Sequence, residues 1–387
     1  MVRILDTTLR EGEQTPGVAF PVHAKIALAE GLERLGVDIV EAGHPVVDKE
    51  IERGVRLLAA RRGEIRVGAH ARSLKGDVDM ALSCGVSFLG LFYCVSRERL
   101  TEGNRTLSQA IESVTSLIRE VKGRAPQVMV RYTPEDTVRT AWPDVAAVAL
   151  EAARAGADVI SVADTTGYMV PGTENNLYDY TLRMRESLVR GGVNPMLAVH
   201  CHNDRGLALA NALDAYRAGV DIIDASVLGL GERAGIVDLA QLMVALRSGW
   251  NEGERWDLTQ LPELYRRVSR FSGIPVPPLA PVVGENAFSH CAGIHTQAAI
   301  RNPLHYQSLD PITVGRCSRV VLDHMAGTSA LLYALRNLGE EDVGEDRLKE
   351  ILLRVKEVGR LGRTVDREEL GFIVASLEAE KREEGAR

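Results

Sequence analysis

Short apolar runs alternate with amphipathic segments through roughly the first 250 residues of the chain. Eight of these runs are rich in valine, isoleucine and leucine, which is typical of strands buried on both faces of a parallel sheet. Segments between the runs, such as 24–35, 146–155 and 207–218, repeat their apolar residues at helical spacing. The predicted strands span residues 2–6, 37–41, 65–70, 86–94, 128–133, 159–165, 197–202 and 222–228.

Three of the predicted helices end in a glycine just before the next strand, at Gly36, Gly156 and Gly219. Glycine is common at this position because it adopts the left-handed conformation in which the chain turns back. Eight strands alternating with helices predict an α/β fold, a (β/α)8 TIM barrel. The alternative is a doubly wound open sheet, which needs a glycine-rich turn after the first strand, whereas the residues there read DTTLREGEQ.

The sequence changes in character after the barrel, which we expect to span residues 1–256. Residues 257–335 begin with a helix and a proline-rich turn and continue as a polar, glycine-rich stretch with little periodicity. We expect this part to be a linker and lid region. Residues 336–387 are charged and helical in pattern, and they predict a small helical C-terminal domain.

Polar side chains gather at the carboxyl ends of the predicted strands, the face on which TIM barrels carry their active sites. Burying such groups costs free energy unless they are paired or bind a ligand, so their concentration at one set of strand ends predicts catalysis. They are Asp6, Arg10, Glu11, Glu41, His44, His70, Arg72, Arg131, Thr133, Glu135, Asp164, Thr165, His200 and His202.

His200 and His202 flank Cys201 in a predicted strand, so their side chains face the same way while the thiol points to the other side. Two imidazoles on an inward face, with the Glu11 carboxylate from the first strand, suit a divalent metal ion. Mg²⁺ or Mn²⁺ is favoured, and Zn²⁺ also tolerates such a donor set. The alternative is a pair of core histidines that are hydrogen-bonded to the backbone.

Two arginines predict binding of an oxygen-rich substrate. Arg10 places a cation next to Glu11, where it can stabilise an oxyanion that develops on a carbonyl group; the alternative is a surface ion pair. Arg131 lies inside an apolar strand and predicts recognition of a carboxylate or phosphonate. A structural ion pair with Glu135 or Asp136 is the alternative for this residue.

Smaller signals surround these residues. Thr133 and Thr165 are placed to hydrogen-bond an acid group, although threonine is common at strand ends. The glycine-rich residues 229–235 follow the last predicted strand, where loops often hold phosphate-bearing ligands, but tight-turn geometry explains them equally well. His290 and His295 lie in a non-periodic stretch outside the barrel, either as surface histidines or with one acting as a general base.

Composition narrows the possible partners. The 387 residues include 46 Lys or Arg and 53 Asp or Glu, a formal net charge of −7 without a basic run, so nucleic acid is not an expected partner. The sequence has neither the apolar run of about 18 residues that a membrane span needs nor a signal-peptide layout. Five scattered cysteines without a CxxC pair fit a reducing compartment, so we expect a cytoplasmic enzyme.

Three motifs together resemble the signatures of the 2-isopropylmalate, homocitrate and citramalate synthases. They are residues 6–14 (DTTLREGEQ), residues 200–208 (HCHNDRGLA) and residues 229–235 (GLGERAG), and their order and spacing match over roughly residues 1–335. The resemblance implies a TIM-barrel acyltransferase that condenses acetyl-CoA with a 2-oxo acid. The products are a 2-hydroxy di- or tricarboxylic acid and free CoA.

The resemblance also implies roles for individual residues. The implied metal ligands are Glu11, His200 and His202. Arg10 then polarises the keto oxygen of the 2-oxo acid, and Thr165 holds its carboxylate.

Two further residues are implied to act on the acetyl group, namely Glu135 and the catalytic histidine, His295. In this family the segment with that histidine comes from the other subunit, so the resemblance implies a homodimer with exchanged C-terminal segments.

The acceptor is expected to be 2-oxoglutarate. Residues 231–236, 288–298 and 302–303 resemble the homocitrate synthase of lysine biosynthesis. That type uses an arginine at the position of Arg131 and a histidine like His70 to hold the far carboxylate of 2-oxoglutarate.

The sequence departs from that pattern in two places. Thr133 replaces a more usual serine, and residues 41–45, which include His44, are closer to the isopropylmalate type. Other acceptors therefore stay open. A phosphonate or phosphinate could lie among Arg72, Arg131, His44 and His70, as in a phosphonomethylmalate or phosphinomethylmalate synthase.

The remaining alternatives are 2-isopropylmalate, citramalate and citrate synthesis. From other classes of protein, an acyl-CoA lyase of the same superfamily and a non-catalytic binding protein built on the barrel are also considered. The lyases carry a cysteine-bearing glycine-rich loop near the third motif, and this sequence lacks it. A non-catalytic binding protein would be expected to have lost metal ligands, whereas all three candidates are present here.

Overall fold

The computed structural model describes residues 1–291, 293–340 and 342–385. Contacts within the chain divide it into two compact units, Met1–Val276 and Pro277–Arg387. Each unit is described by itself. Within the described residues, no helix is both long enough and apolar enough to cross a membrane.

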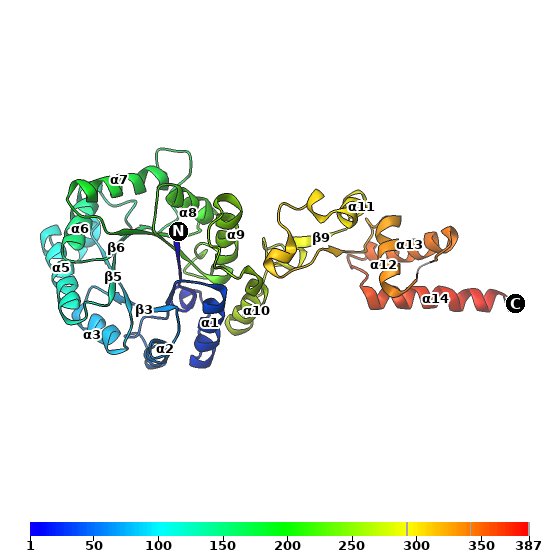
Figure 1. The fold of residues 1–387 in the computed structure, drawn as a ribbon, viewed down its shortest axis with the longest axis horizontal. Coiled ribbons are helices and arrows are strands. Elements are labelled where there is room, and N and C mark those ends of the chain that lie inside the picture. Colours follow the sequence, from blue (N-terminus) through cyan, green and yellow to red (C-terminus); the bar gives the residue numbers. More distant parts are fainter. Residues whose placement is uncertain (292, 341, 386–387) are drawn as a thin grey trace. The chain divides into compact units, whose positions relative to one another are not determined.

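The first unit, all of which is described, is built on eight parallel strands that close into a barrel surrounded by helices (Figure 1). Strand β1 pairs with β2 on one side and with β8 on the other, which closes the sheet. This closure confirms the predicted TIM barrel and excludes the doubly wound open sheet. The strands are β1 (Arg3–Asp6), β2 (Ile39–Glu41), β3 (Arg66–Arg72), β4 (Phe88–Cys94), β5 (Met129–Glu135), β6 (Val159–Asp164), β7 (Met196–Cys201) and β8 (Ile222–Ala225).

The helices of this unit follow the predicted alternation with the strands. They are α1 (Val22–Leu35), α2 (Lys49–Ala59), α3 (Lys75–Ser83), α4 (Arg97–Glu102), α5 (Leu107–Arg124), α6 (Trp142–Arg154), α7 (Leu177–Arg190), α8 (Ala208–Arg217), α9 (Leu239–Trp250) and α10 (Leu261–Ser272). Short 3₁₀ turns lie at η1 (Gly12–Gln14), η2 (Val227–Gly229) and η3 (Leu258–Gln260). The turn η1 follows β1 and lies within the motif of residues 6–14, and η2 follows β8 and ends at Gly229, where the glycine-rich motif begins.

Glycines end the helices where the sequence predicts them. Gly36, Gly156 and Gly219 follow α1, α6 and α8 with φ of 92°, 108° and 84°. A residue with a Cβ is strained in this left-handed region. Side chains from alternate strands fill the barrel interior, which is typical of the fold. One interior cluster consists of Leu5, Ile39, Phe88, Val159, Ala198 and Ile222.

The second unit contains helices around a small apolar core. A two-stranded sheet of β9 (Ser289–His290) and β10 (Arg319–Val320) is followed by a core that includes Leu331, Leu335, Ile351, Val355 and Leu370. Helix α12 begins at Thr328, inside residues 257–335, where the sequence shows little periodicity and predicts a linker and lid region. The helices are α11 (Gly293–Arg301), α12 (Thr328–Leu338), α13 (Glu345–Arg360) and α14 (Arg367–Gly385), with 3₁₀ turns η4 (Glu285–Phe288), η5 (Pro303–His305) and η6 (Pro311–Val314).

Candidate active site

A cavity of about 290 Å³ opens at the carboxyl ends of the barrel strands. Ten of the fourteen candidate site residues predicted in the barrel line this cavity. The four that do not are Asp6, Glu41, Arg72 and Asp164. The barrel folding alone therefore brings together residues up to 223 positions apart. The lining residues are Arg10, Glu11, Gln14, His44, His70, Phe92, Arg131, Thr133, Glu135, Ala163, Thr165, His200, His202, Glu232 and Arg233.

Glu11, His200 and His202 are buried, and their potential ligand atoms lie within 4.8 Å of one another. The two Nε2 atoms of the histidines are 3.3 Å apart, and His202 Nε2 lies 4.0 Å from Glu11 Oε1. Burial, followed by the neighbouring His200, lowers the pKa of His202 to about 4. Two imidazole Nε2 atoms this close together beside a carboxylate make a donor set that fits a divalent cation.

The charge of Glu11 is consistent with a ligand role. Burial acts to raise its pKa, but Arg10 and the two histidines outweigh burial, and the pKa lies below the usual value for glutamate. Arg10 Nη1 contacts the Glu11 carboxylate, and the backbone N–H of Glu232 donates to Glu11 Oε1 at 3.2 Å. The carboxylate is therefore ionised and held in place from two sides.

Two buried carboxylates each bridge an imidazole and a guanidinium. Asp224, on β8, accepts from His200 Nδ1 at 3.0 Å and from the Nη1 and Nη2 atoms of Arg131 at 2.7 Å each. Glu41, on β2, accepts from His70 Nδ1 at 3.1 Å and from Arg10 Nε at 2.5 Å. Each carboxylate binds the Nδ1 proton of its histidine, so the Nε2 atom carries the lone pair.

Arg131 is buried, as expected for a residue inside a strand, and it forms a structural ion pair, but neither Glu135 nor Asp136, the two acids considered as alternatives, is its partner. Asp136 instead binds Arg139 at 2.7 Å, and Arg99 is the cation nearest Glu135, at 3.9 Å. The partner is Asp224 from β8, which reaches Arg131 through the barrel interior. The sequence placed this carboxylate 93 residues away, where local reasoning could not find it.

His70 is held by a ring as well as by an acid. Its imidazole stacks on Phe92, with ring centroids 4.8 Å apart and planes 12° apart. Burial, followed by the charge of Arg10, lowers the pKa of His70 to about 4 although Glu41 acts to raise it. At neutral pH the ring is therefore uncharged in the ligand-free site.

The remaining polar groups of the cavity are placed to bind or to exchange a proton. Thr133 Oγ1 accepts from Arg131 Nε at 3.3 Å, and Thr165 Oγ1 accepts from the Asp136 N–H at 3.0 Å, which leaves both hydroxyl protons available for a ligand. Burial raises the pKa of Glu135, a direction that suits a carboxylate that accepts and returns a proton.

The glycine-rich loop supports Glu11 through its backbone. Gly235 has a φ of 79°, and a Cβ there would lie 1.8 Å from the Gly229 carbonyl oxygen. A Cβ on Gly231 would lie 3.1 Å from Glu11 Cγ. Thr15 Oγ1 fastens the loop by donating to the Gly231 carbonyl at 3.1 Å and accepting its N–H at 2.9 Å. These close approaches explain why glycine occupies positions 231 and 235 of the loop.

His295, the predicted catalytic histidine, lies in the second unit on α11. Its side chain is exposed and its ring lies against Tyr306, with ring centroids 4.4 Å apart. His290 is engaged differently, since its Nε2 lies 2.8 Å from the Gln307 amide. Of the two histidines, His295 is therefore the one with an exposed ring.

Sequence reasoning missed the functions of two buried residues. Asp224 was not selected, although an acid inside an apolar strand is itself a signal of a buried partner. Lys25 lies on the inner face of α1, where its Nζ donates to the Leu9 carbonyl at 2.8 Å, the Ala42 carbonyl at 3.0 Å and Glu13 at 2.6 Å. It ties together the chain segments that carry Arg10 and Glu41.

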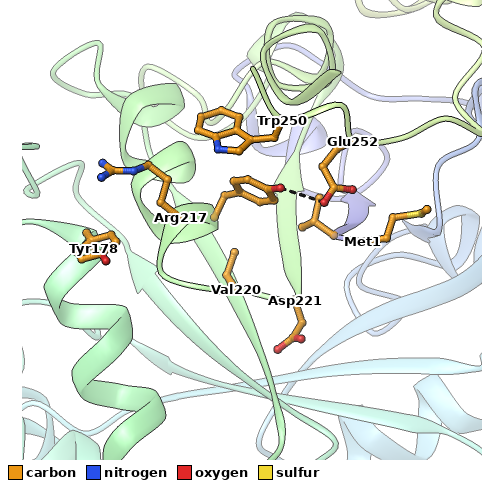
Figure 2. A pocket seen from close by; sticks show the side chains of 10 residues that line it. Met1, Tyr178, Arg217, Val220, Asp221, Trp250 and Glu252 are labelled. Atoms are coloured by element: carbon orange, nitrogen blue, oxygen red, sulfur yellow. Dashed lines mark hydrogen bonds between the residues drawn. The ribbon is translucent and has the colours of Figure 1, made fainter. Parts of the chain in front are cut away.

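A larger hollow, of about 530 Å³, lies beside the amino-terminal end of β8, whereas the candidate active site lies at the carboxyl ends of the strands (Figure 2). Several of its polar groups are paired with one another or with nearby residues: the Tyr216 hydroxyl donates to Glu252 at 2.9 Å, and Asp221 accepts from Arg185 at 2.7 Å. The amino-terminal face of a TIM barrel usually contributes to stability. The chemistry therefore belongs to the smaller cavity.

Comparisons with known proteins agree with this geometry. The HMGL-like family matches residues 1–268, and a domain described as homocitrate synthase post-HMGL domain-like matches residues 282–363. The homocitrate synthase of Pyrococcus horikoshii is 41% identical over 354 residues, which cover 91% of this chain and 94% of that protein. The homocitrate synthase of Saccharolobus islandicus is 36% identical over 360 residues, covering 92% of this chain and 76% of that protein.

Solved structures share the barrel. The HMG-CoA lyase of Pseudomonas aeruginosa matches with a TM-score of 0.58 and 25% identity, and the match covers 71% of this chain and 94% of the lyase chain. The HMG-CoA lyase of Brucella melitensis has a TM-score of 0.57 and 22% identity and covers 70% of this chain and 99% of its own. Likeness at this level of identity concerns the fold, whereas the more similar relatives are synthases. The chain therefore belongs to the HMGL-like family and, within it, to the homocitrate synthase family.

Proposed function

We propose that this protein condenses acetyl-CoA with 2-oxoglutarate to form homocitrate and free CoA. The observation that supports it best is one cavity that holds a Glu–His–His donor set together with Arg10, Arg131 and His70. A donor set of this kind suits the 2-oxo group, and the second set of basic residues suits the additional carboxylate of a diacid.

Glu11, His200 and His202 would hold a divalent metal ion, for which we propose Mg²⁺ or Mn²⁺, with Zn²⁺ as the alternative. When bound, such an ion acts as a Lewis acid on the keto oxygen. The ion pairs of the cavity favour a cation here, because Arg10 faces two carboxylates, Glu11 and Glu41, and leaves an excess of negative charge.

The side chains around this set bind and orient the acceptor. Arg10 donates to the keto oxygen as negative charge develops on it. Thr165 donates its hydroxyl proton to the adjacent carboxylate. Arg131, Thr133 and His70 bind the far carboxylate.

Carbon–carbon bond formation requires a base. We assign to His295, assisted by Glu135, the removal of a proton from the acetyl methyl group. The resulting carbanion attacks the keto carbon, and the alkoxide that forms takes up a proton. Water then cleaves the thioester, so that one acetyl-CoA, one 2-oxoglutarate and one water give homocitrate and CoA.

His295 would act in the active site of a partner subunit within a homodimer that exchanges C-terminal segments. The side chain of His295 is exposed on α11, which is compatible with a role in the site of another subunit. We place the enzyme in the cytoplasm, in keeping with scattered cysteines that form no CxxC pair.

One of the basic residues expected to surround a phosphonate, Arg72, lies outside the cavity. It is half exposed and binds Asp77 at 2.7 and 3.1 Å. His44 does line it, so phosphonopyruvate belongs in the test as a competitor.

The test is release of CoA thiol by purified protein with Mg²⁺ or Mn²⁺, acetyl-CoA and one acceptor at a time. The acceptors are 2-oxoglutarate, phosphonopyruvate, 2-oxoisovalerate, pyruvate and oxaloacetate. Release with 2-oxoglutarate far above the others is expected. Preference for another acceptor would reassign the substrate, and no release with any of them would overturn the condensation.

An Arg131→Ala variant tests the assignment of the far carboxylate. The KM for 2-oxoglutarate should rise at least tenfold, since a hydrogen bond to a charged group contributes roughly 1.5–3 kcal/mol. Arg72→Ala is the matched control from the rim and should leave the KM unchanged. An unchanged KM in Arg131→Ala would remove Arg131 from acceptor recognition.

A further inference from the structure

We propose that His70 takes up one proton from solvent when the acceptor binds, and then donates a hydrogen bond from Nε2 to the far carboxylate. Acceptor binding is thereby coupled to proton uptake. This inference rests on the proposed function, because it requires an acceptor with a second carboxylate.

The position of the His70 ring proton follows from its contact with Glu41. His70 Nδ1 lies 3.1 Å from Glu41 Oε1, while Glu41 Oε2 accepts from Arg10 Nε at 2.5 Å and from the Thr7 hydroxyl at 2.8 Å. The cations around Glu41 hold its pKa well below the usual value despite its burial, so it is ionised and only accepts. The proton of the neutral ring therefore lies on Nδ1, and Nε2 carries a lone pair.

The ring cannot easily turn to present its other nitrogen. It stacks on Phe92 on one side, and a Cβ at Gly90 would lie 3.1 Å from both His70 Nδ1 and Glu41 Oε1. The histidine–glutamate pair thus packs directly against a strand backbone without a side chain. The nitrogen available to the cavity is Nε2.

A carboxylate that approaches a neutral His70 would meet a lone pair with its own lone pairs. Arg131 does not supply the missing charge by itself, because it is already paired with Asp224 through two hydrogen bonds of 2.7 Å. Protonation of His70 at Nε2 supplies a donor and a positive charge together. The Glu41 carboxylate behind the ring stabilises the imidazolium that forms.

The charged groups around His70 come from several elements, and they determine when it becomes protonated. Arg10, after β1, opposes protonation in the ligand-free site, and Glu41, on β2, favours it. Arg131, on β5, also lines the cavity. An incoming carboxylate tips this balance, because it places a second negative charge beside the ring.

His44 is the rival group, since it also lines the cavity and its ring lies 6.1 Å from that of His70. Its Nε2 is held by Asp77 on α3 at 3.1 Å, and Asp77 also binds Arg72 of β3. The experiment must therefore separate the two histidines.

Isothermal titration calorimetry counts the protons. Mg²⁺-loaded protein without acetyl-CoA is titrated with 2-oxoglutarate at pH 6.0 in phosphate and in Bis-Tris, buffers of different ionisation enthalpy. The difference in binding heat should correspond to uptake of about one proton, and the affinity should fall about tenfold per pH unit between about pH 5 and pH 6, above the pKa of His70 in the ligand-free site. The ligand 2-oxovalerate, which has the same chain length but a methyl end, should bind without uptake.

Two variants identify the group. His70→Gln, whose amide donates without gaining a proton, should bind 2-oxoglutarate with no uptake, whereas His44→Gln should retain it. Equal uptake with both ligands in the unaltered protein, no uptake at all, or uptake that survives in His70→Gln would overturn the inference. Absence of 2-oxoglutarate binding would overturn the proposed function itself, and binding without uptake leaves that function intact.

Discussion

Asp224 is the residue on which both halves of the candidate site depend. It is fully buried and binds His200 through Nδ1 and Arg131 through both terminal nitrogens. Partners of this kind orient a metal-binding histidine and raise its basicity. Asp224 is therefore not a candidate metal ligand itself, but it holds the ring of the candidate ligand His200.

An Asp224→Asn variant should bind Mn²⁺ roughly 10–100-fold more weakly, because the amide has no negative charge and its NH2 group would face an N–H donor of Arg131 where a carboxylate oxygen now accepts. Competition with a chelating dye measures the affinity. Asp221→Asn, just before the same strand, is the matched control and should bind Mn²⁺ normally. Equal affinity in the two variants would contradict the role of Asp224.

His70 makes the stability of the ligand-free protein depend on pH. Its pKa is about 4 in the folded protein and 6.5 for an ordinary histidine, so between these values the unfolded chain binds a proton that the folded protein does not. Stability contributed by this group is therefore complete above pH 6.5 and is lost as the pH falls towards 4, by about 3 kcal/mol in all.

Urea unfolding at pH 7 and pH 4.5 should reveal this loss as a difference between the unaltered protein and His70→Gln. The variant should lose less stability on acidification, because glutamine does not titrate. The same pH dependence in both proteins would show that His70 is not held neutral in the fold.

At the scale of elements, the loop after β8 is a support for the metal-ligand candidate Glu11. Gly235→Ala should destabilise the protein and weaken Mn²⁺ binding, since a Cβ would lie 1.8 Å from the Gly229 carbonyl oxygen and displace the segment that donates to Glu11. Gly219→Ala is a matched control, because Gly219 has a similar φ of 84° but no atom within 4 Å of the added Cβ.

The control should lose only about 1 kcal/mol of unfolding free energy, the approximate cost of a left-handed conformation for alanine. Its Mn²⁺ affinity should be unchanged. If both variants behaved alike, the loop would be an ordinary turn rather than a support for Glu11.

The elements themselves were largely predictable from the sequence. Strands buried on both faces show as apolar runs, and helix ends show as glycines such as Gly36 and Gly219, because each signal is local. The metal-ligand candidates His200, near the end of β7, and His202, just after it, are two residues apart and were equally readable. The pairing of Arg131 with Asp224 was not, because a partner in a closed barrel comes from a strand that is distant in the sequence.

For the whole molecule, the proposal that two chains build each active site can be tested by mixing inactive subunits. His200→Ala and His295→Ala should each be inactive alone. Random exchange makes half of the dimers mixed, and each mixed dimer regains one intact site of two. About a quarter of the unaltered activity should therefore return. If each chain builds its own site, the mixture should stay as inactive as its components.

The most direct test of the central claim is a competition among acceptors. Limiting ¹³C-acetyl-CoA and Mg²⁺ are added to protein with equal concentrations of 2-oxoglutarate, phosphonopyruvate, 2-oxoisovalerate, pyruvate and oxaloacetate, and the labelled products are identified by mass spectrometry. Their ratio reports the relative kcat/KM of the acceptors. The account predicts labelled homocitrate as the dominant product. A dominant product from any other acceptor would contradict it.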